Sequence, residues 1–193
     1  MQRLDGFSDA AWEVVQRKPT ARILDCTAGN RHIWGKVKMR DDVIFTDKEP
    51  NLIIPADLLT TWKDLPNHFP QNYFHCAIID PPFYFSNKCP YFQHPREKEN
   101  HPRQGPFYGY PFSSRRAMLG AIYEAQSAIS VVAPRLCFKW GEINISTDRI
   151  LTLFDKWNVI SISPYKAYKN FKNGRCAWVK LVRRTVDDKD GSK

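Results

Sequence analysis

The segment Ile78–Phe83 (IIDPPF) constrains the fold more than any other part of the chain. A largely apolar run that begins at Phe74 ends there in an acid and two prolines. A short continuous apolar run is typical of a buried strand in a parallel sheet. Neither Pro81 nor Pro82 has an N–H with which to extend the ladder of hydrogen bonds. The strand must therefore stop at Asp80, at the edge where open α/β sheets bind their ligands.

Other predicted strands lead to acids in the same way. We expect four successive strands, within residues 21–25, 43–47, 51–57 and 74–80, each ending in an acid: Asp25, Asp47, Asp57 and Asp80. One acid after a strand means little, but four in phase indicate a common edge. Because the carboxyl ends of parallel strands meet at one edge of a sheet, we expect these carboxylates to line it.

A loop of small residues follows the first strand. Cys26-Thr27-Ala28-Gly29-Asn30 leads into a helix predicted over residues 31–37. Small side chains allow the backbone of such a loop to approach a ligand closely. The sequence thus predicts a strand, an acid, a loop and a helix in succession.

The remaining elements follow from hydrophobic periodicity and capping residues. Helices are expected over 8–17, with Ser8 as N-cap, over 62–65, over 115–132 after Ser113-Ser114, and over 147–156. Further strands are expected over 135–142, 157–164 and 175–184. The five cysteines show no C-x-x-C spacing, which favours a reducing compartment over a disulfide framework. No apolar run approaches the ~20 residues of a membrane span.

The segment Asp80–Phe83 resembles the D-P-P-[FYW] motif of S-adenosylmethionine-dependent methyltransferases that modify the exocyclic amine of adenine or cytosine. The strand-end acids and the loop after Asp25 resemble the first three motifs of class I, Rossmann-like methyltransferases. The runs Ala28–Trp34 (AGNRHIW) and Lys139–Glu142 (KWGE) are similar to runs in small phage-type and archaeal-type methyltransferases. One departure concerns the loop: Arg31 stands where the first motif usually has a second glycine.

This resemblance implies an α/β fold with a three-layer, Rossmann-like sheet of about seven strands, of which strand 7 is antiparallel. It extends over about residues 20–184. We expect one domain spanning 1–193, with an N-terminal helix in 1–19, a substrate-loop insertion at 84–113 and a frayed tail at 185–193. A domain of this length has no room for a separate target-recognition domain of ~100 residues or more.

The resemblance also implies the site. The cofactor would be S-adenosylmethionine, bound by Asp25, Thr27, Ala28, Gly29, Asn30, Asp47, Asp57 and Asp80. Asp80 and the carbonyl of Pro81 would accept the N–H bonds of the target amine, with Pro82 completing the turn and Phe83 stacking on the base. An aryl amine is a weak nucleophile because its lone pair is delocalised into the ring, and two acceptors favour its pyramidal form.

A formal net charge of +9 favours a polyanion as partner. Cations alternate with aromatic residues in two segments, 84–113 and 165–175, a composition suited to unpaired or flipped bases. The predicted nucleic-acid contacts are Lys88, Arg96, Lys98, Arg103, Tyr108, Arg115, Arg116, Lys139, Lys166, Lys169, Lys172 and Arg175. Cys89, His94 and His101 fit no zinc spacing, so no metal is expected.

The hypothesis that follows is a cytoplasmic methyltransferase of structured RNA, with RNA favoured over DNA and N6 of adenine slightly favoured over N4 of cytosine. Phage-type DNA modification is the second possibility. A nucleic-acid-binding protein without catalysis is a third, prompted by Arg31, and a small-molecule or protein-glutamine methyltransferase is disfavoured by the charge. The sequence leaves the oligomeric state open, a monomer included.

Overall fold

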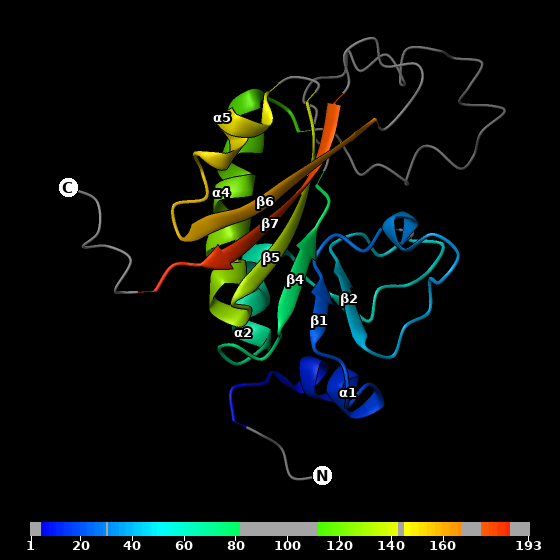
Figure 1. The fold of residues 1–193 in the computed structure, drawn as a ribbon. Coiled ribbons are helices and arrows are strands. Elements are labelled where there is room, and N and C mark those ends of the chain that lie inside the picture. Colours follow the sequence, from blue (N-terminus) through cyan, green and yellow to red (C-terminus); the bar gives the residue numbers. More distant parts are fainter. Residues whose placement is uncertain (1–4, 30, 82–111, 143–144, 167–174, 186–193) are drawn as a thin grey trace, which may run out of the picture.

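A seven-stranded sheet with the strand order β3-β2-β1-β4-β5-β7-β6 forms the centre of the protein (Figure 1). The structure is a computed structural model that describes residues 5–29, 31–81, 112–142, 145–166 and 175–185. The strands are β1 (Ile23–Asp25), β2 (Val43–Asp47), β3 (Leu58–Leu59), β4 (Cys76–Ile79), β5 (Arg135–Gly141), β6 (Trp157–Lys166) and β7 (Arg175–Arg183).

The strand directions confirm the predicted fold class. Strands β3, β2, β1, β4 and β5 are parallel, and β7 runs antiparallel to both β5 and β6. This is the Rossmann-like α/β arrangement with strand 7 reversed. The helices are α1 (Asp9–Arg17), η1 (His32–Trp34), η2 (Trp62–Asp64), α2 (Leu65–His68), α4 (Arg115–Val132) and α5 (Thr147–Leu151).

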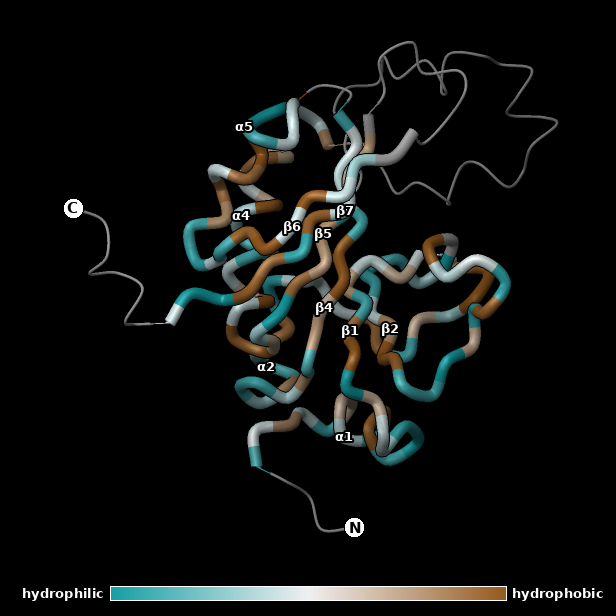
Figure 2. The backbone as a smooth tube through the Cα atoms, viewed as in Figure 1, coloured by the Kyte–Doolittle hydropathy of each residue, from teal (hydrophilic) through white to brown (hydrophobic). Residues whose placement is uncertain are grey.

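One face of the sheet carries the main hydrophobic core. Inward residues of the strands, among them Leu24, Ile44, Phe138 and Val179, pack there with buried residues of α1, α2, α4 and α5. Figure 1 shows α4 and α5 beside β5, β6 and β7, with α1 at the lower end of β1. Hydropathic colouring shows apolar residues concentrated in the strands β1 and β2 (Figure 2).

The opposite face is covered unevenly. Over β1 and β2 it carries a small second core of Ala28, Val43 and Phe45, packed against Ile23 and Trp34. Along β5 burial alternates, with Leu136 and Phe138 buried and Cys137 and Lys139 only partly so. Among the described residues, no helix lies over this face of β4, β5 and β7 (Figure 1).

Three predicted elements differ from the structure. The helix expected over 31–37 is a single 3₁₀ turn, η1, because Gly35 takes a positive φ of 58° and ends it. The helix expected over 147–156 stops at Leu151, where the chain turns toward β6. The third strand is only Leu58–Leu59, so Asp57 precedes a strand instead of ending one. The apolar run Leu52–Ile54, which suggested an earlier strand, lies between Pro50 and Pro55.

Candidate active site

The carboxyl edge of the sheet brings three of the predicted acids together. The register places Asp25 beside Phe45 on β2 and Ile78 on β4. Asp47 and Asp80 lie two residues beyond these partners, so they flank the loop that follows Asp25 and share its face of the sheet. The edge therefore presents three carboxylates from three adjacent strands.

Thr27 connects this loop to the strand-ending acid. Its backbone N–H donates to Asp25 Oδ1 at 3.1 Å, and its hydroxyl oxygen accepts the backbone N–H of Asp80 at 2.7 Å. The N–H of Cys26 also donates to the carbonyl of Ile78 at 2.9 Å. These bonds fix the small-residue loop against the start of the Asp80-Pro81 segment, in which Pro81 is buried.

Asp25 is fully buried and bound on both oxygens. The indole Nε1 of Trp34 donates to its Oδ2 at 2.7 Å, opposite the bond from Thr27. Burial raises the pKa of Asp25 to about 6, against the lowering effect of these two hydrogen bonds. The negative charges of Asp80 and Asp47 raise the pKa further, which shows that the three carboxylates interact electrostatically.

Asp47 closes the other side of the loop. Its Oδ2 accepts the backbone N–H of Gly29 at 2.8 Å, and its Oδ1 accepts the N–H of Glu49 at 3.0 Å. Gly29 has a φ of +45°, a conformation that L side chains rarely adopt. A carboxylate has further lone pairs, so Asp47 can accept additional hydroxyl donors at this edge.

Asp80 forms an ion pair with Lys139. The ammonium Nζ lies 2.6 Å from Asp80 Oδ2, and the side chains of Lys139 and Asp80 are 20% and 18% exposed, so the pair is only partly shielded from water. Lys139 Nζ also lies 6.0 Å from the centroid of the Trp178 ring. Sequence reasoning assigned Lys139 to nucleic-acid contact but missed this pairing, which only the adjacency of β4 and β5 creates.

Arg31 has a glycine-like backbone but a buried side chain. Its φ is 57°, so the position where the family pattern has glycine keeps the left-handed conformation. The guanidinium lies 3.8 Å from the centroid of the Phe45 ring and donates to the carbonyls of Lys38 and Pro55. Arg31 thus packs its side chain on Phe45 of β2, a structural role that the sequence did not indicate.

The carboxylate of Asp57 binds other groups of the protein. Its Oδ2 accepts from Lys18 Nζ at 2.7 Å and from the backbone N–H of Phe45 at 2.9 Å. Its predicted contact with the cofactor adenine remains a prediction. In this pairing Asp57 differs from Asp25 and Asp47, because a lysine already neutralises it.

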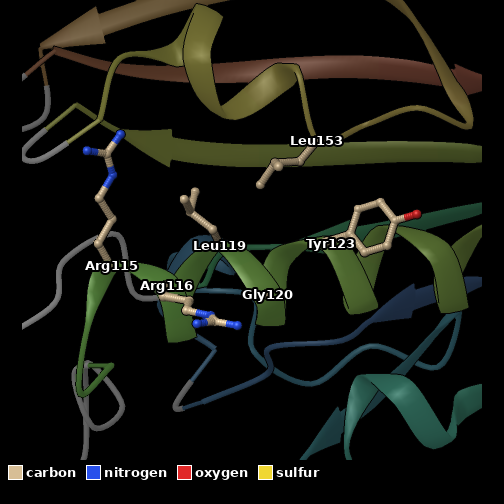
Figure 3. A pocket seen from close by; sticks show the side chains of 6 residues that line it. All are labelled: Arg115, Arg116, Leu119, Gly120, Tyr123 and Leu153. Atoms are coloured by element: carbon tan, nitrogen blue, oxygen red, sulfur yellow. The ribbon is translucent and has the colours of Figure 1, made fainter.

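The structure describes only some of the remaining predicted site residues. Arg115 and Arg116 open α4 after the N-cap Ser114, whose side chain accepts from the N–H of Ala117. They lie at one end of a shallow hollow along α4, with Tyr123 farther along it (Figure 3). Lys166 and Arg175 end β6 and begin β7. Outside the described residues lie Asn30, Pro82, Phe83, Lys88, Arg96, Lys98, Arg103, Tyr108, Lys169 and Lys172.

The other residues of the KWGE run support the fold. Trp140 is fully buried, stacks on Phe138 and donates its indole N–H to the carbonyl of Ile145 at 2.9 Å. Glu142 accepts the N–H of Thr147 at 2.8 Å, which anchors the first turn of α5. In the part of the chain that the structure describes, no three His, Cys, Asp or Glu side chains form a metal-binding group. No helix within that part is both long and apolar enough to cross a membrane.

The thiols of Cys76 and Cys137 lie side by side, and Cys137 is two residues before Lys139 on β5. The Sγ atoms of Cys76 on β4 and Cys137 on β5 are 3.9 Å apart. Hydrogen bonding from Cys76, together with the positive charge of Lys180, lowers the pKa of Cys137 to about 7, and the same pairing raises the pKa of Cys76. Cys137 is partly exposed, whereas Cys26 and Cys176 are buried.

We therefore expect iodoacetamide to alkylate Cys137 faster than Cys26 and Cys176 at neutral pH. Because the reactive species is the thiolate, the rate should rise through about pH 7 instead of the ~8.5 of a free cysteine. Peptide mass spectrometry of quenched time points gives the rate at each pH. In Cys76→Ala the midpoint should move upward; an unchanged midpoint would show that Cys76 does not lower this pKa.

Several solved structures are similar to this chain. No family model matches the chain, and no curated protein matches it in sequence. Among solved structures, the N-methyltransferase NodS from Bradyrhizobium japonicum WM9 is 10% identical, with a TM-score of 0.49 over 91% of this chain and 94% of that one.

Two further structures are similar to a lower degree. A W203A mutant of a 16S rRNA (adenine(1408)-N(1))-methyltransferase from Catenulisporales acidiphilia is 12% identical, with a TM-score of 0.47 over 94% of this chain and 96% of that chain. An rRNA methylase from Streptococcus thermophilus is 13% identical, with a TM-score of 0.43 over 96% of this chain and 100% of that chain.

Proposed function

We propose that the protein is an S-adenosylmethionine-dependent methyltransferase whose acceptor is an exocyclic amine of a nucleic-acid base. The observation that carries this proposal is the hydrogen bond between Thr27 Oγ1 and the backbone N–H of Asp80. It joins the loop assigned to the methyl donor to the segment assigned to the methyl acceptor. Holding two reactants in line can supply ~7–11 kcal/mol of the barrier reduction.

The charges at this edge suit the cofactor. S-adenosylmethionine carries a positive sulfonium, and the carboxylates of Asp80 and Asp47 contribute to the raised pKa of Asp25. A cation bound among them relieves that repulsion. In this proposal Asp47 accepts the ribose hydroxyls, and the loop of Thr27, Ala28, Gly29 and Asn30 passes under the methionine part. Asp57 stays assigned to the adenine end.

The acceptor side rests on Asp80 and its neighbours. The carboxylate of Asp80 and the carbonyl of Pro81 accept the two N–H bonds of the amine, and Phe83 stacks on the base, which is swung out of its strand. Lys139 holds the carboxylate of Asp80 in place through their ion pair. During transfer the nitrogen lone pair forms the new N–C bond, the methyl–sulfur bond breaks with its electrons kept by sulfur, and the surplus N–H proton leaves to solvent.

Structured RNA of the cytoplasm, ribosomal or transfer RNA, is the proposed substrate. The net charge of +9 suits a polyanion, and structured RNA offers a shape by which a protein can select its target. The aspartate at the first motif position favours N6 of adenine over N4 of cytosine. Phage-type DNA modification is the alternative.

Transfer of labelled methyl groups tests the proposal. The protein is incubated with methyl-labelled S-adenosylmethionine and, separately, with total RNA, genomic DNA or a protein extract. We expect label in RNA and none in protein. Label confined to protein would contradict a base amine as acceptor, and label confined to DNA would select the alternative. Absence of any heat in a titration with S-adenosylmethionine would contradict the assignment as an enzyme.

A further inference from the structure

The face of β5 and β7 over which no described helix lies carries a row of cations that leads to Asp80. Antiparallel pairing places Arg135 opposite Val182, Cys137 opposite Lys180, and Lys139 opposite Trp178. Paired residues share a face of the sheet. Arg135, Lys180 and Lys139 therefore follow one another in steps of two residues, ~6.8 Å each.

These side chains are accessible in the described structure. Arg135 and Lys180 are exposed, and Trp178, Val182 and Cys137 are partly exposed. Lys180 lies directly opposite Cys137 on the neighbouring strand, so the two residues share this face of the sheet. Neither β5 nor β7 contains an acidic residue. The row is therefore positive along its length and meets its first carboxylate at Asp80.

We propose that this face, formed by Arg135, Lys180 and Trp178, is the path along which an unpaired nucleic-acid strand runs to Asp80. Arg135 and Lys180 contact phosphates, and Trp178 offers a ring on which a base stacks beside the Lys139–Asp80 pair. Charge complementarity selects the occupant, because a row of cations with an indole at the end nearest Asp80 suits a polyanion with planar bases. This inference rests on the proposed function and names how the substrate reaches its site.

The path differs from the two aromatic–basic segments predicted from the sequence. Within β5 and β7 the cations stand singly among apolar residues, without the alternation of cations and aromatic residues seen in those two segments. Only the pairing of the two strands, and the absence of a described helix above them, brings Arg135 and Lys180 into one row.

The test compares two double variants with the same change in charge. Arg135→Gln/Lys180→Gln removes two cations from the path, and Arg17→Gln/Arg149→Gln removes two exposed cations from α1 and α5, which pack on the opposite face. Fluorescence anisotropy measures binding of a labelled single strand of about 20 nucleotides, as RNA and as DNA, over a series of salt concentrations. Thermal melting confirms that both variants are folded.

The path variant should bind about tenfold more weakly, and the slope of log K against log salt should become shallower by about 1.4, or ~0.7 for each of the two phosphates that the variant no longer neutralises. The control variant should change binding less than about threefold, and Trp178→Ala should weaken binding of the single strand but not of a duplex. Equal weakening in both double variants, or none in either, would overturn the path. Tighter binding of RNA or of DNA identifies the kind of strand.

Protection of Cys137 gives an independent readout. A strand lying over β5 and β7 should slow alkylation of Cys137 in the wild type severalfold, and half-maximal protection in the path variant should need about ten times more strand. Unchanged alkylation at saturating strand would contradict the proposal. These measurements need no methyl transfer, so a protein that binds along the path without transferring methyl would refute the proposed function alone. A path variant with wild-type kcat/KM on RNA would refute the path alone.

Discussion

Replacing Asp80 by alanine is expected to reduce methyl transfer about 100- to 1,000-fold, while the affinity for S-adenosylmethionine changes less than about threefold. The size follows from the loss of a preorganised hydrogen-bonding group at the reacting centre. Cofactor affinity should change little because the Thr27–Asp80 bond uses the backbone N–H of Asp80, which alanine retains, and because Lys139 already neutralises the carboxylate that is removed. Single-turnover rates and isothermal titration give the two quantities separately.

Two matched variants sharpen this prediction. Asp80→Asn keeps the shape and one acceptor oxygen, so its rate should lie between wild type and Asp80→Ala. Asp80→Ala leaves the partly shielded ammonium of Lys139 without its carboxylate partner. The double variant Asp80→Ala/Lys139→Gln also removes the positive charge of Lys139. The double variant should recover thermal stability but no activity. Recovery of activity would show that the carboxylate is needed only to neutralise Lys139.

Replacing Asp47 by alanine should have the reverse pattern, with the dissociation constant for S-adenosylmethionine raised about 10- to 100-fold. A charge-assisted hydrogen bond contributes about 1.5–3 kcal/mol, and Asp47 is assigned to the ribose hydroxyls. The substitution also frees the N–H of Gly29, which Asp47 now holds at 2.8 Å. At saturating cofactor the rate of transfer should stay within about fivefold of wild type.

Glu49→Ala provides the control for Asp47. It removes an acid two residues away whose carboxylate accepts the backbone N–H of Asn51, a neighbour in the same turn. Its cofactor affinity should match that of wild type. Equal losses of affinity in Asp47→Ala and Glu49→Ala would indicate a general electrostatic effect. Equal losses in Asp47→Ala and Asp80→Ala would contradict the division of roles between the two acids.

Elements with strong local signals were predicted closely from the sequence. Strand β2 and helix α4 have the bounds that hydrophobic pattern and capping indicate, Val43–Asp47 and Arg115–Val132, and Ser8 caps α1 as expected. In these segments periodicity, caps and breakers all favour the same structure. The seven-stranded sheet with an antiparallel β7 agrees with the succession of elements.

Features that depend on distant residues were not predicted. The pairing of Asp80 with Lys139 and of Cys76 with Cys137 arises only when β4 and β5 become neighbours, although the partners lie far apart in the chain. The helix predicted over 31–37 is only the turn η1, because Gly35 takes a positive φ there, and the packing of the Arg31 guanidinium on Phe45 depends on a residue 14 positions away. The face of β5 and β7 over which no described helix lies is likewise a property of the assembled sheet.

The most direct test of methyl transfer to a base amine is mass spectrometry of nucleosides. RNA from cells lacking the protein is incubated with S-adenosylmethionine and either wild type or Asp80→Ala, then digested completely to nucleosides. The account predicts that wild type produces N6-methyladenosine, or N4-methylcytidine as the alternative, above the level found with Asp80→Ala. A methylated product on carbon, ribose or a ring nitrogen, or equal products from both proteins, would contradict it.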